Sequence, residues 1–447
     1  MEFNIDECSC TVASIDQFSN LKLQPLLKNL LDRDFFRYYK VNMHRPCPFW
    51  TENEECKMGK ECGIAECDDE VPAALKNSIP NGSQGQKPSI SVSAAKVTVS
   101  RHSSSGNRNG ELEEQCVPET SNSFDPLDRT ISDAAHEAFL RWADFDDSEN
   151  KFCDIDDDNS SDLHYVDLSR NPERYTGYAG ASAARVWKSI YLENCFKPNP
   201  KFDKNFLLNP KVTGLCLEKR VFFRLISGLH TSITVQVSAN HHTPAPGGFG
   251  PGVWGPNVDM FKNRFSEETT NGEGPQRLRN LFFAFALELR AVEKVAPYLR
   301  QETFYTGNTD EDDGTRALVD EILRHVEAFD NHFDETQMFQ GPPARARELK
   351  EEFRQHFWNI SRIMDCVGCD KCRLWGKVHI HGMATALKIL FSNIPATTTD
   401  TDSPHLASFV PFQLRRDDIV ALFHSLGRYA SSIEEISKFR KLIEEES

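Results

Sequence analysis

Large apolar residues recur at helical spacing over much of the chain, and this spacing predicts the main elements of the fold. Apolar side chains repeated every three or four positions form one face of an α-helix, whereas strands alternate in twos. Three stretches follow the helical pattern: Val186, Trp187, Ile190 and Tyr191; Leu278, Leu281, Phe282, Phe285, Leu289 and Val292; and Leu349, Phe353, Phe357, Ile360 and Met364. We therefore expect helices over these residues.

The C-terminal part continues the pattern. A helix is expected to begin near the last cysteine cluster and to run through Leu387 and Leu390, and two shorter helices are expected over 416–427 and 432–444. Residues 232–237, rich in β-branched side chains, fit either a strand or the end of a helix. The Gly- and Pro-rich stretch 241–252 is expected to be a flexible loop.

The N-terminal third is organised differently. Residues 1–70 are rich in cysteine and partly helical, and residues 74–128 are poor in large apolar side chains, which predicts a mobile loop. An acidic loop is expected over 144–158. Since no repeat is present, we expect a mainly α fold: a single domain over 1–447 with long irregular loops that carry cysteines, and a mobile segment over about 47–130.

Composition excludes some functions. The 447 residues are 39% hydrophobic, enough for a substantial core, and the net charge of −16 argues against a nucleic-acid binder, because neutralising phosphates needs a cationic surface. The longest apolar run, 281–287, is far shorter than the roughly 20 residues that span a bilayer, which leaves only peripheral membrane association open. No apolar leader follows Met1, as expected for a mature or trimmed chain.

Thirteen cysteines change this picture, because they are clustered rather than scattered. Clustered cysteines indicate disulfides, redox chemistry or metal binding. Three Asn-X-Ser sequons, at Asn81, Asn159 and Asn359, are candidate glycosylation sites.

Cys369 and Cys372 form a C-x-x-C pair where a helix is expected to begin. Unpaired backbone N–H groups of the first helical turn lower a thiol pKa, and we expect the charges of Lys371 and Arg373 to add to this. The spacing lets the two sulfurs meet in a disulfide that can open and close. The local pattern also fits a zinc site or an inert pair.

A second cluster lies in polar surroundings and consists of Cys47, Cys56, Cys62 and Cys67. Exposed cysteines on a flexible segment can exchange disulfides with a partner protein. The cluster also fits a static disulfide, or a zinc site with His379 and His381 as further ligands.

Two further patterns are decoys. Gly250–Gly255 matches G-x-G-x-x-G but contains Pro251 and lacks a βαβ context, so a dinucleotide fold of that kind is not expected. The acidic stretch Asp154–Asp158 has no glycine at the sixth position of a calcium loop. No metal site is expected.

Several long blocks, in order along most of the chain, resemble the endoplasmic reticulum oxidoreductins, flavoenzymes that reoxidise protein disulfide isomerase. The blocks are Asp34–Asn42, Arg45–Trp50, Asn171–Tyr178, Glu193–Pro198, Phe223–His230, Gly272–Pro275 and Asn359–Gly376. The resemblance implies a helical fold around bound FAD and a location in the endoplasmic reticulum lumen. The FAD contacts that it implies are Arg174, Thr176, Trp187, Ser227, His230, Arg264 and Arg277. Indole stacks on flat rings, and arginines suit a pyrophosphate.

The resemblance also implies a relay of disulfide exchange. Protein disulfide isomerase, or a related thioredoxin-like oxidoreductase, would reduce a shuttle disulfide between Cys56 and Cys62. The shuttle would then reduce Cys369–Cys372, with Cys372 nearer the flavin, and molecular oxygen would accept the electrons to give hydrogen peroxide.

Further disulfides follow from the same resemblance. Cys47–Cys366 and Cys195–Cys216 would be structural, and a regulatory state would pair Cys56 with Cys116 and Cys62 with Cys67. Two features depart from the family pattern: five residues separate Cys56 from Cys62 where four are usual, and Cys8 and Cys10 lack upstream partners. The alternative function is a non-catalytic zinc-binding or disulfide-stabilised interaction protein.

Overall fold

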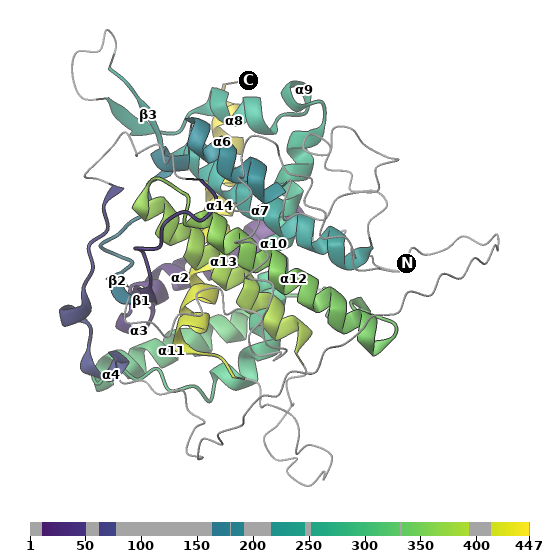
Figure 1. Cartoon of the computed structure of the whole chain (residues 1–447). Helices are drawn as coiled ribbons and strands as arrows, with labels where there is room; N and C mark the ends of the chain where they lie inside the picture. Colours follow the sequence, from purple (N-terminus) through teal and green to yellow (C-terminus); the bar gives the residue numbers. More distant parts are fainter. Residues whose placement is uncertain are drawn as a thin grey trace, which may run out of the picture.

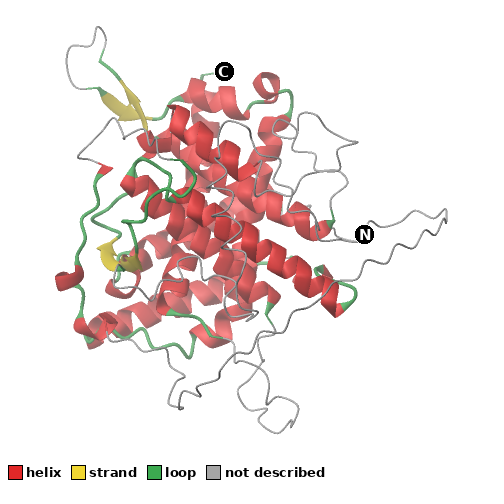
Figure 2. Cartoon of the chain, in the orientation of Figure 1, coloured by secondary structure: helices red, strands yellow, loops and turns green. Residues whose placement is uncertain are grey.

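A computed structural model describes residues 11–50, 62–76, 163–178, 180–191, 216–245, 252–330, 333–392 and 413–446. In these ranges the chain is mostly helical, and its strands form two short antiparallel pairs (Figure 2). No helix among them is long and apolar enough to cross a membrane.

The N-terminal elements precede the main bundle. They are α1 (Val12–Phe18), the π-helix η2 (Ser19–Leu23), α2 (Gln24–Leu31), α3 (Asp34–Arg37), β1 (Tyr38–Val41), the 3₁₀ turn η4 (Asp68–Glu70), α4 (Ala73–Lys76), β2 (His164–Asp167), the 3₁₀ turn η6 (Tyr175–Tyr178) and α6 (Gly180–Ser189). β1 pairs with β2 so that Val41 lies opposite His164. Part of the segment that we expected to be mobile is docked here, because Glu66 forms a β-bridge with Val166.

Long helices make up the second half. The elements are α7 (Leu217–Ala239), β3 (His241–Thr243), β4 (Val253–Gly255), α8 (Val258–Phe265), α9 (Glu267–Thr270), α10 (Glu273–Leu299), α11 (Thr309–Glu327), η9 (Glu335–Gln337), α12 (Pro343–Met364), α13 (Asp370–Phe391) and α14 (Arg416–Glu445). α13 packs against α10, α12 and α14 at the centre of the bundle, and α7 packs along α10 (Figure 1).

Helix α13 is buried on all sides. Every residue from Gly376 to Leu390 is buried, which explains why this segment is apolar around the helix rather than along one stripe. Its buried cations have partners: Lys377 Nζ lies 2.8 Å from Asp365, and Lys388 Nζ lies 3.5 Å from Asp418. Pairing of this kind offsets the cost of removing a charge from water.

Two expectations about secondary structure need correction, and a third, which left a strand and a helix end open, is decided for the helix end. The two helices expected over 416–427 and 432–444 are one helix, α14, because Arg428 interrupts the apolar pattern yet is buried and paired with Glu173. Residues 232–237 belong to α7 and not to a strand, since packing against other helices overrides their β propensity. The expected loop 241–252 begins with β3, which pairs with β4 in a hairpin that leaves Val253 and Trp254 exposed (Figure 1).

Gly382 allows the closest approach of α13 and α14, which generates a prediction. A Cβ at this position would lie 2.5 Å from Ser425 Cβ and 2.9 Å from the Ala421 carbonyl carbon. We expect Gly382→Ala to lower the free energy of unfolding by about 1–3 kcal/mol, because overpacking outweighs the better helix propensity of alanine. Thermal unfolding measures this.

Gly255→Ala is the matched control, because a Cβ there meets nothing within 4 Å. An unchanged melting temperature for Gly382→Ala would contradict the tight packing of α13 on α14.

Candidate functional site

Cys369 and Cys372 lie at the start of α13, as the sequence predicts. Cys369 is the N-cap residue, with extended backbone angles, and Cys372 lies in the first turn. Both are buried, and both are free thiols, so the structure presents the pair as a dithiol. A disulfide between them would form with the release of two electrons and two protons.

The two thiols differ in acidity. A hydrogen bond from Cys372 lowers the pKa of Cys369, and the backbone N–H groups of Cys372 and Lys371 lower it further. Burial raises the pKa of Cys372 well above its usual value, and the hydrogen bond to Cys369 and the Cys369 and Glu173 charges raise it further. The dithiol therefore loses its first proton from Cys369.

We expected the charges of Lys371 and Arg373 to lower the Cys369 pKa, but they are not among the main causes of its shift. Arg373 is engaged elsewhere, because its guanidinium donates to the Met43 carbonyl at 2.6 Å and to Asp370 at 2.9 Å. The helix terminus and the partner thiol, rather than the charges of Lys371 and Arg373, account for the lowered pKa of Cys369.

Turn η6 covers the cysteine pair. A Cβ on Gly177 would lie 2.5 Å from Cys369 Cβ and 3.0 Å from Cys369 Sγ, and closer still to Cys372 Sγ. The Cys372 thiol donates to the carbonyl oxygen of Arg174, just before the turn. Glycine is the only residue that fits this approach, so the backbone of η6 lies directly on the two sulfurs.

A buried polar network fixes this turn, and we did not foresee it from the sequence. The Tyr178 hydroxyl donates to Glu173 and lies 3.0 Å from the Cys372 carbonyl oxygen, and Arg428 of α14 forms an ion pair with Glu173. Burial raises the pKa of Glu173, but the Arg428 charge and a hydrogen bond with His379 bring it below its usual value. Only the block Asn171–Tyr178 could have pointed to Glu173 and Tyr178, and no local pattern pointed to Arg428.

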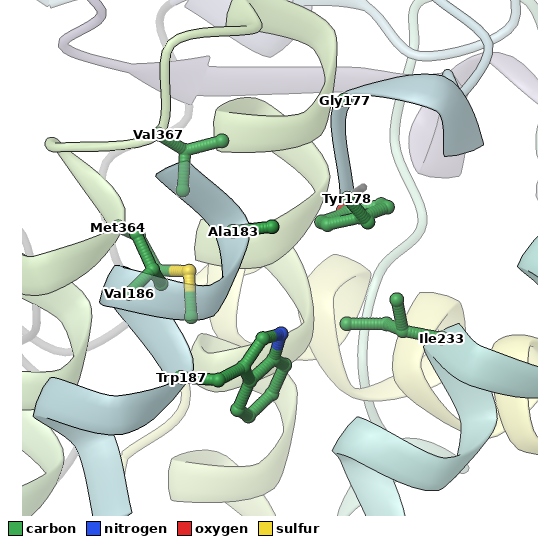
Figure 3. Close-up of a pocket in the computed structure, with 8 residues that line it drawn as sticks. All are labelled: Gly177, Tyr178, Ala183, Val186, Trp187, Ile233, Met364 and Val367. Carbon is green, nitrogen blue, oxygen red and sulfur yellow. The ribbon is translucent and has the colours of Figure 1, made fainter. Parts of the chain in front are cut away.

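An apolar cavity begins beside η6 (Figure 3). Its volume is about 10 Å³, room for about one water molecule. The lining residues are Gly177, Tyr178, Ala183, Val186, Trp187, Ile233, Met364 and Val367. Because Gly177 also contacts both cysteines, the cavity lies next to the thiol pair.

Trp187 connects this cavity with the other residues expected to hold a cofactor. Its indole stacks on the His230 ring, with centroids 3.9 Å apart and planes 13° apart. Burial and the charges of Arg264 and Arg277 lower the pKa of His230 to about 3, so the imidazole is neutral at neutral pH. Ser227, one turn before His230 on α7, accepts a hydrogen bond from Asn280 at 2.9 Å.

The structure places six of the seven residues expected to bind the cofactor. The carbonyl oxygen of Arg174 contacts Cys372 of the thiol pair. The other five lie on helices α6, α7, α8 and α10: Trp187, Ser227, His230, Arg264 and Arg277. The side chain of Thr176 lies outside the described residues.

The second cysteine cluster is described only in part. Cys62 and Cys67 are buried, not exposed as expected, because their segment packs against β2. Cys62 is disulfide-bonded, while Cys67 is a free thiol whose pKa burial raises to about 11. The regulatory Cys62–Cys67 pair is therefore not formed in this structure. Cys56 and Cys116 lie outside the described residues.

Cys47 and Cys366 are joined by a disulfide across a sequence separation of 319 residues. The resemblance implies this bridge, which ties the chain before the second cluster to the start of α13. Cys216 is also disulfide-bonded, and its expected partner Cys195 lies outside the described residues.

The structure also places the two histidines considered as zinc ligands and one of the three sequons. His381 hydrogen-bonds Tyr39 and Asp418, and His379 is buried beside Glu173, so neither is available as a zinc ligand for the second cluster. Asn359 is partly buried within α12, and the other two sequons, at Asn81 and Asn159, lie outside the described residues, as do Cys8, Cys10 and the acidic loop 144–158.

Comparisons with known proteins agree with this arrangement. Residues 22–436 match the family model "Endoplasmic Reticulum Oxidoreductin 1 (ERO1)". The chain is 50% identical to "Endoplasmic reticulum oxidoreductin-1" of Caenorhabditis elegans over 444 residues, which are 98% of this chain and 87% of the relative. It is 42% identical to human "ERO1-like protein alpha", over 98% of this chain and 90% of the relative.

Solved structures share the fold. A mutant of S. cerevisiae Ero1p is 25% identical, with a TM-score of 0.57 and 99% of each chain covered. A second Ero1p structure, described as the source of disulfide bonds for oxidative protein folding in the cell, is 24% identical with a TM-score of 0.58, over 97% of this chain and 98% of that one. The match of these helical folds, the thiol pair at α13 and the family match over residues 22–436 lead to one conclusion: this chain belongs to the endoplasmic reticulum oxidoreductin 1 family of oxidoreductases.

Proposed function

We propose that the protein is a thiol oxidase of the endoplasmic reticulum lumen that makes disulfides and passes the electrons to molecular oxygen. The observation that carries this proposal is the buried dithiol at the start of α13, with one lowered thiol pKa and an apolar, indole-lined cavity beside it. The balance is a partner dithiol plus O₂ giving a partner disulfide plus H₂O₂. Cys369–Cys372 is reduced and reoxidised once in each cycle.

The residues around the cavity suit FAD. A neutral His230, an indole and two arginines offer stacking faces and cations for a dinucleotide, and the apolar lining suits a flavin ring. When bound, the flavin would accept two electrons from a dithiol and transfer them to oxygen. Trp187 and His230 would hold it by stacking, and Arg264 and Arg277 would hold its phosphates.

Trp187 joins the two parts of the proposed binding region. Its indole is in ring contact with His230, and it also lines the small cavity beside the thiol pair. The turn η6 that covers the thiols lies just before α6, which carries Trp187, so a shift of α6 on cofactor binding would be transmitted to the cysteine pair.

The roles of the two thiols follow from their surroundings. Cys372 contacts Arg174 and Tyr178 at the cavity side, which supports its assignment as the sulfur nearer the cofactor. Cys369 caps the helix and carries the lowered pKa, so it is the thiol of the reduced pair that ionises first. η6 and α13 bury both sulfurs, which favours an external shuttle, Cys56–Cys62, over direct attack by a large substrate.

The first prediction concerns the inner pair. We expect Cys369→Ala and Cys372→Ala each to abolish oxygen uptake with a small dithiol, because neither variant can form the disulfide. An oxygen electrode measures this, and Cys153→Ala, which changes a cysteine with no assigned role, is the control.

Purified protein should also show the visible absorption of a bound flavin. A colourless protein with stoichiometric zinc would instead support the alternative function, a non-catalytic interaction protein.

The second prediction separates the shuttle from the inner pair. Cys56→Ala should remove oxidation of protein disulfide isomerase while a small dithiol that reaches Cys369–Cys372 still supports oxygen uptake. Unchanged isomerase oxidation by this variant would remove Cys56 from the relay.

The third prediction concerns pH. The single Cys372 S–H donates to the Arg174 carbonyl, and it must turn to the Cys369 sulfur when that thiol ionises. Cys372→Ala removes this donor and should therefore raise the Cys369 pKa and reduce its thiolate at neutral pH. Cys372→Ser retains a donor and should preserve the lowered pKa, with thiolate disappearing only as the pH falls through that value. Thiolate ultraviolet absorbance of the reduced proteins, with Cys369→Ala as the blank, measures both. Equal titration curves for the two variants would contradict the role of this hydrogen bond.

A further inference from the structure

Three segments distant in sequence bring two imidazoles and a carboxylate together beside the β1–β2 pair. His44 follows β1, Glu66 forms the bridge to Val166, and His164 begins β2. One ligand atom from each of these side chains lies within 4.8 Å of the other two. His44 Nε2 is 2.9 Å from Glu66 Oε1, and His164 Nδ1 is 3.8 Å from Glu66 Oε2.

The backbone fixes two of these three positions independently of the side chains. His164 lies opposite Val41 in the strand register, and the amide of Cys67 donates to the Tyr165 carbonyl at 2.9 Å. The His44 amide donates to the Asn42 side chain at 2.9 Å. Backbone pairing thus places His164 and Glu66, while His44 lies in the loop just after β1 and is exposed.

A fourth residue lies beside one of the imidazoles. Asp68 Oδ2 lies 2.6 Å from His164 Nδ1, and its other oxygen accepts from the Tyr165 amide at 2.8 Å. Asp68 and Glu66 thus face the same ring nitrogen, so an ion bound at His164 Nδ1 would replace the proton shared with Asp68 and would find a second carboxylate oxygen there. Asp68 also adds a second negative charge beside Glu66.

The donor set selects the type of cation. Two imidazole nitrogens and one carboxylate are typical of zinc sites that keep a fourth position for water, whereas Ca²⁺ and Mg²⁺ prefer oxygen ligands throughout. The two imidazole rings are 5.6 Å apart and nearly perpendicular, so they approach Glu66 from different directions. We propose that His44, Glu66 and His164 form a zinc-binding site, with Asp68 as a further carboxylate beside the His164 nitrogen.

Bound zinc would join the segment of Cys62 and Cys67 to the body of the protein. Glu66 is the neighbour of Cys67, and His44 lies three residues before the bridged Cys47. The proposal is independent of the thiol oxidase function, because none of its ligands contacts Cys369, Cys372 or the cavity.

The test is a titration of the full chain with Zn²⁺ against a chromophoric chelator at neutral pH. We expect one site that Glu66→Gln and His44→Asn each weaken by more than about 100-fold and Asp68→Asn weakens by about 10- to 100-fold. His242→Asn, a change of an exposed histidine on the hairpin, should leave binding unchanged. Affinity should fall in acid, because protons compete with the metal for its ligands.

Cysteine ligands must be distinguished from this site. Co²⁺ bound at His44, Glu66 and His164 should lack a thiolate charge-transfer band, and Cys67→Ser should leave its spectrum unchanged. No zinc binding, equal affinity in Glu66→Gln and wild type, or a thiolate band lost in Cys369→Ala would each overturn the proposal. Glutamine has nearly the same size and shape as glutamate, so Glu66→Gln should fold normally. It therefore tests the site even if His44→Asn disturbs folding.

Discussion

From Gly376 to Leu390 helix α13 has no side that faces solvent, and the polar side chains of such a buried segment need partners inside the protein. Lys377 pairs with Asp365, Lys388 and His381 share Asp418, and His379 lies beside Glu173. These partners come from the end of α12, from α14 and from the segment before η6. The burial that makes α13 the centre of the bundle therefore also determines which elements surround its N-terminus.

The cysteine pair takes its properties from the same arrangement. Glu173 is held by Arg428 of α14, and through Tyr178 it fixes the turn whose glycine lies on both sulfurs. Its negative charge also contributes to the raised pKa of Cys372, whereas the helix terminus lowers that of Cys369. The two chemically identical thiols differ in acidity mainly because Cys372 is the more deeply buried and Cys369 receives its hydrogen bond. The Glu173 charge on one side and backbone N–H groups on the other increase this difference.

Periodicity and local spacing predicted the long helices and the position of Cys369 and Cys372, because both depend on neighbours within a few residues. The same reasoning divided α14 at Arg428, since a buried arginine looks like an exposed one until Glu173 is placed beside it. It also missed the cluster of His44, Glu66 and His164, whose members are brought together only by strand register. Polar neighbours suggested that Cys62 and Cys67 are exposed, although their segment is docked. Each failure concerns a partner that is distant in sequence.

The Cys47–Cys366 bridge has a consequence for the order in which the chain is made. Its two cysteines are 319 residues apart in sequence. Because chains are synthesised at about 5–20 residues per second, Cys47 is made roughly 15–65 s before Cys366. During that interval Cys56, Cys62 and Cys67 are the nearest thiols available to it. A nascent chain that pairs with its neighbours must exchange them before α13 can be anchored. Competence of the inner pair is thus a late event in the life of each molecule, reached only after about four fifths of the chain has been translated.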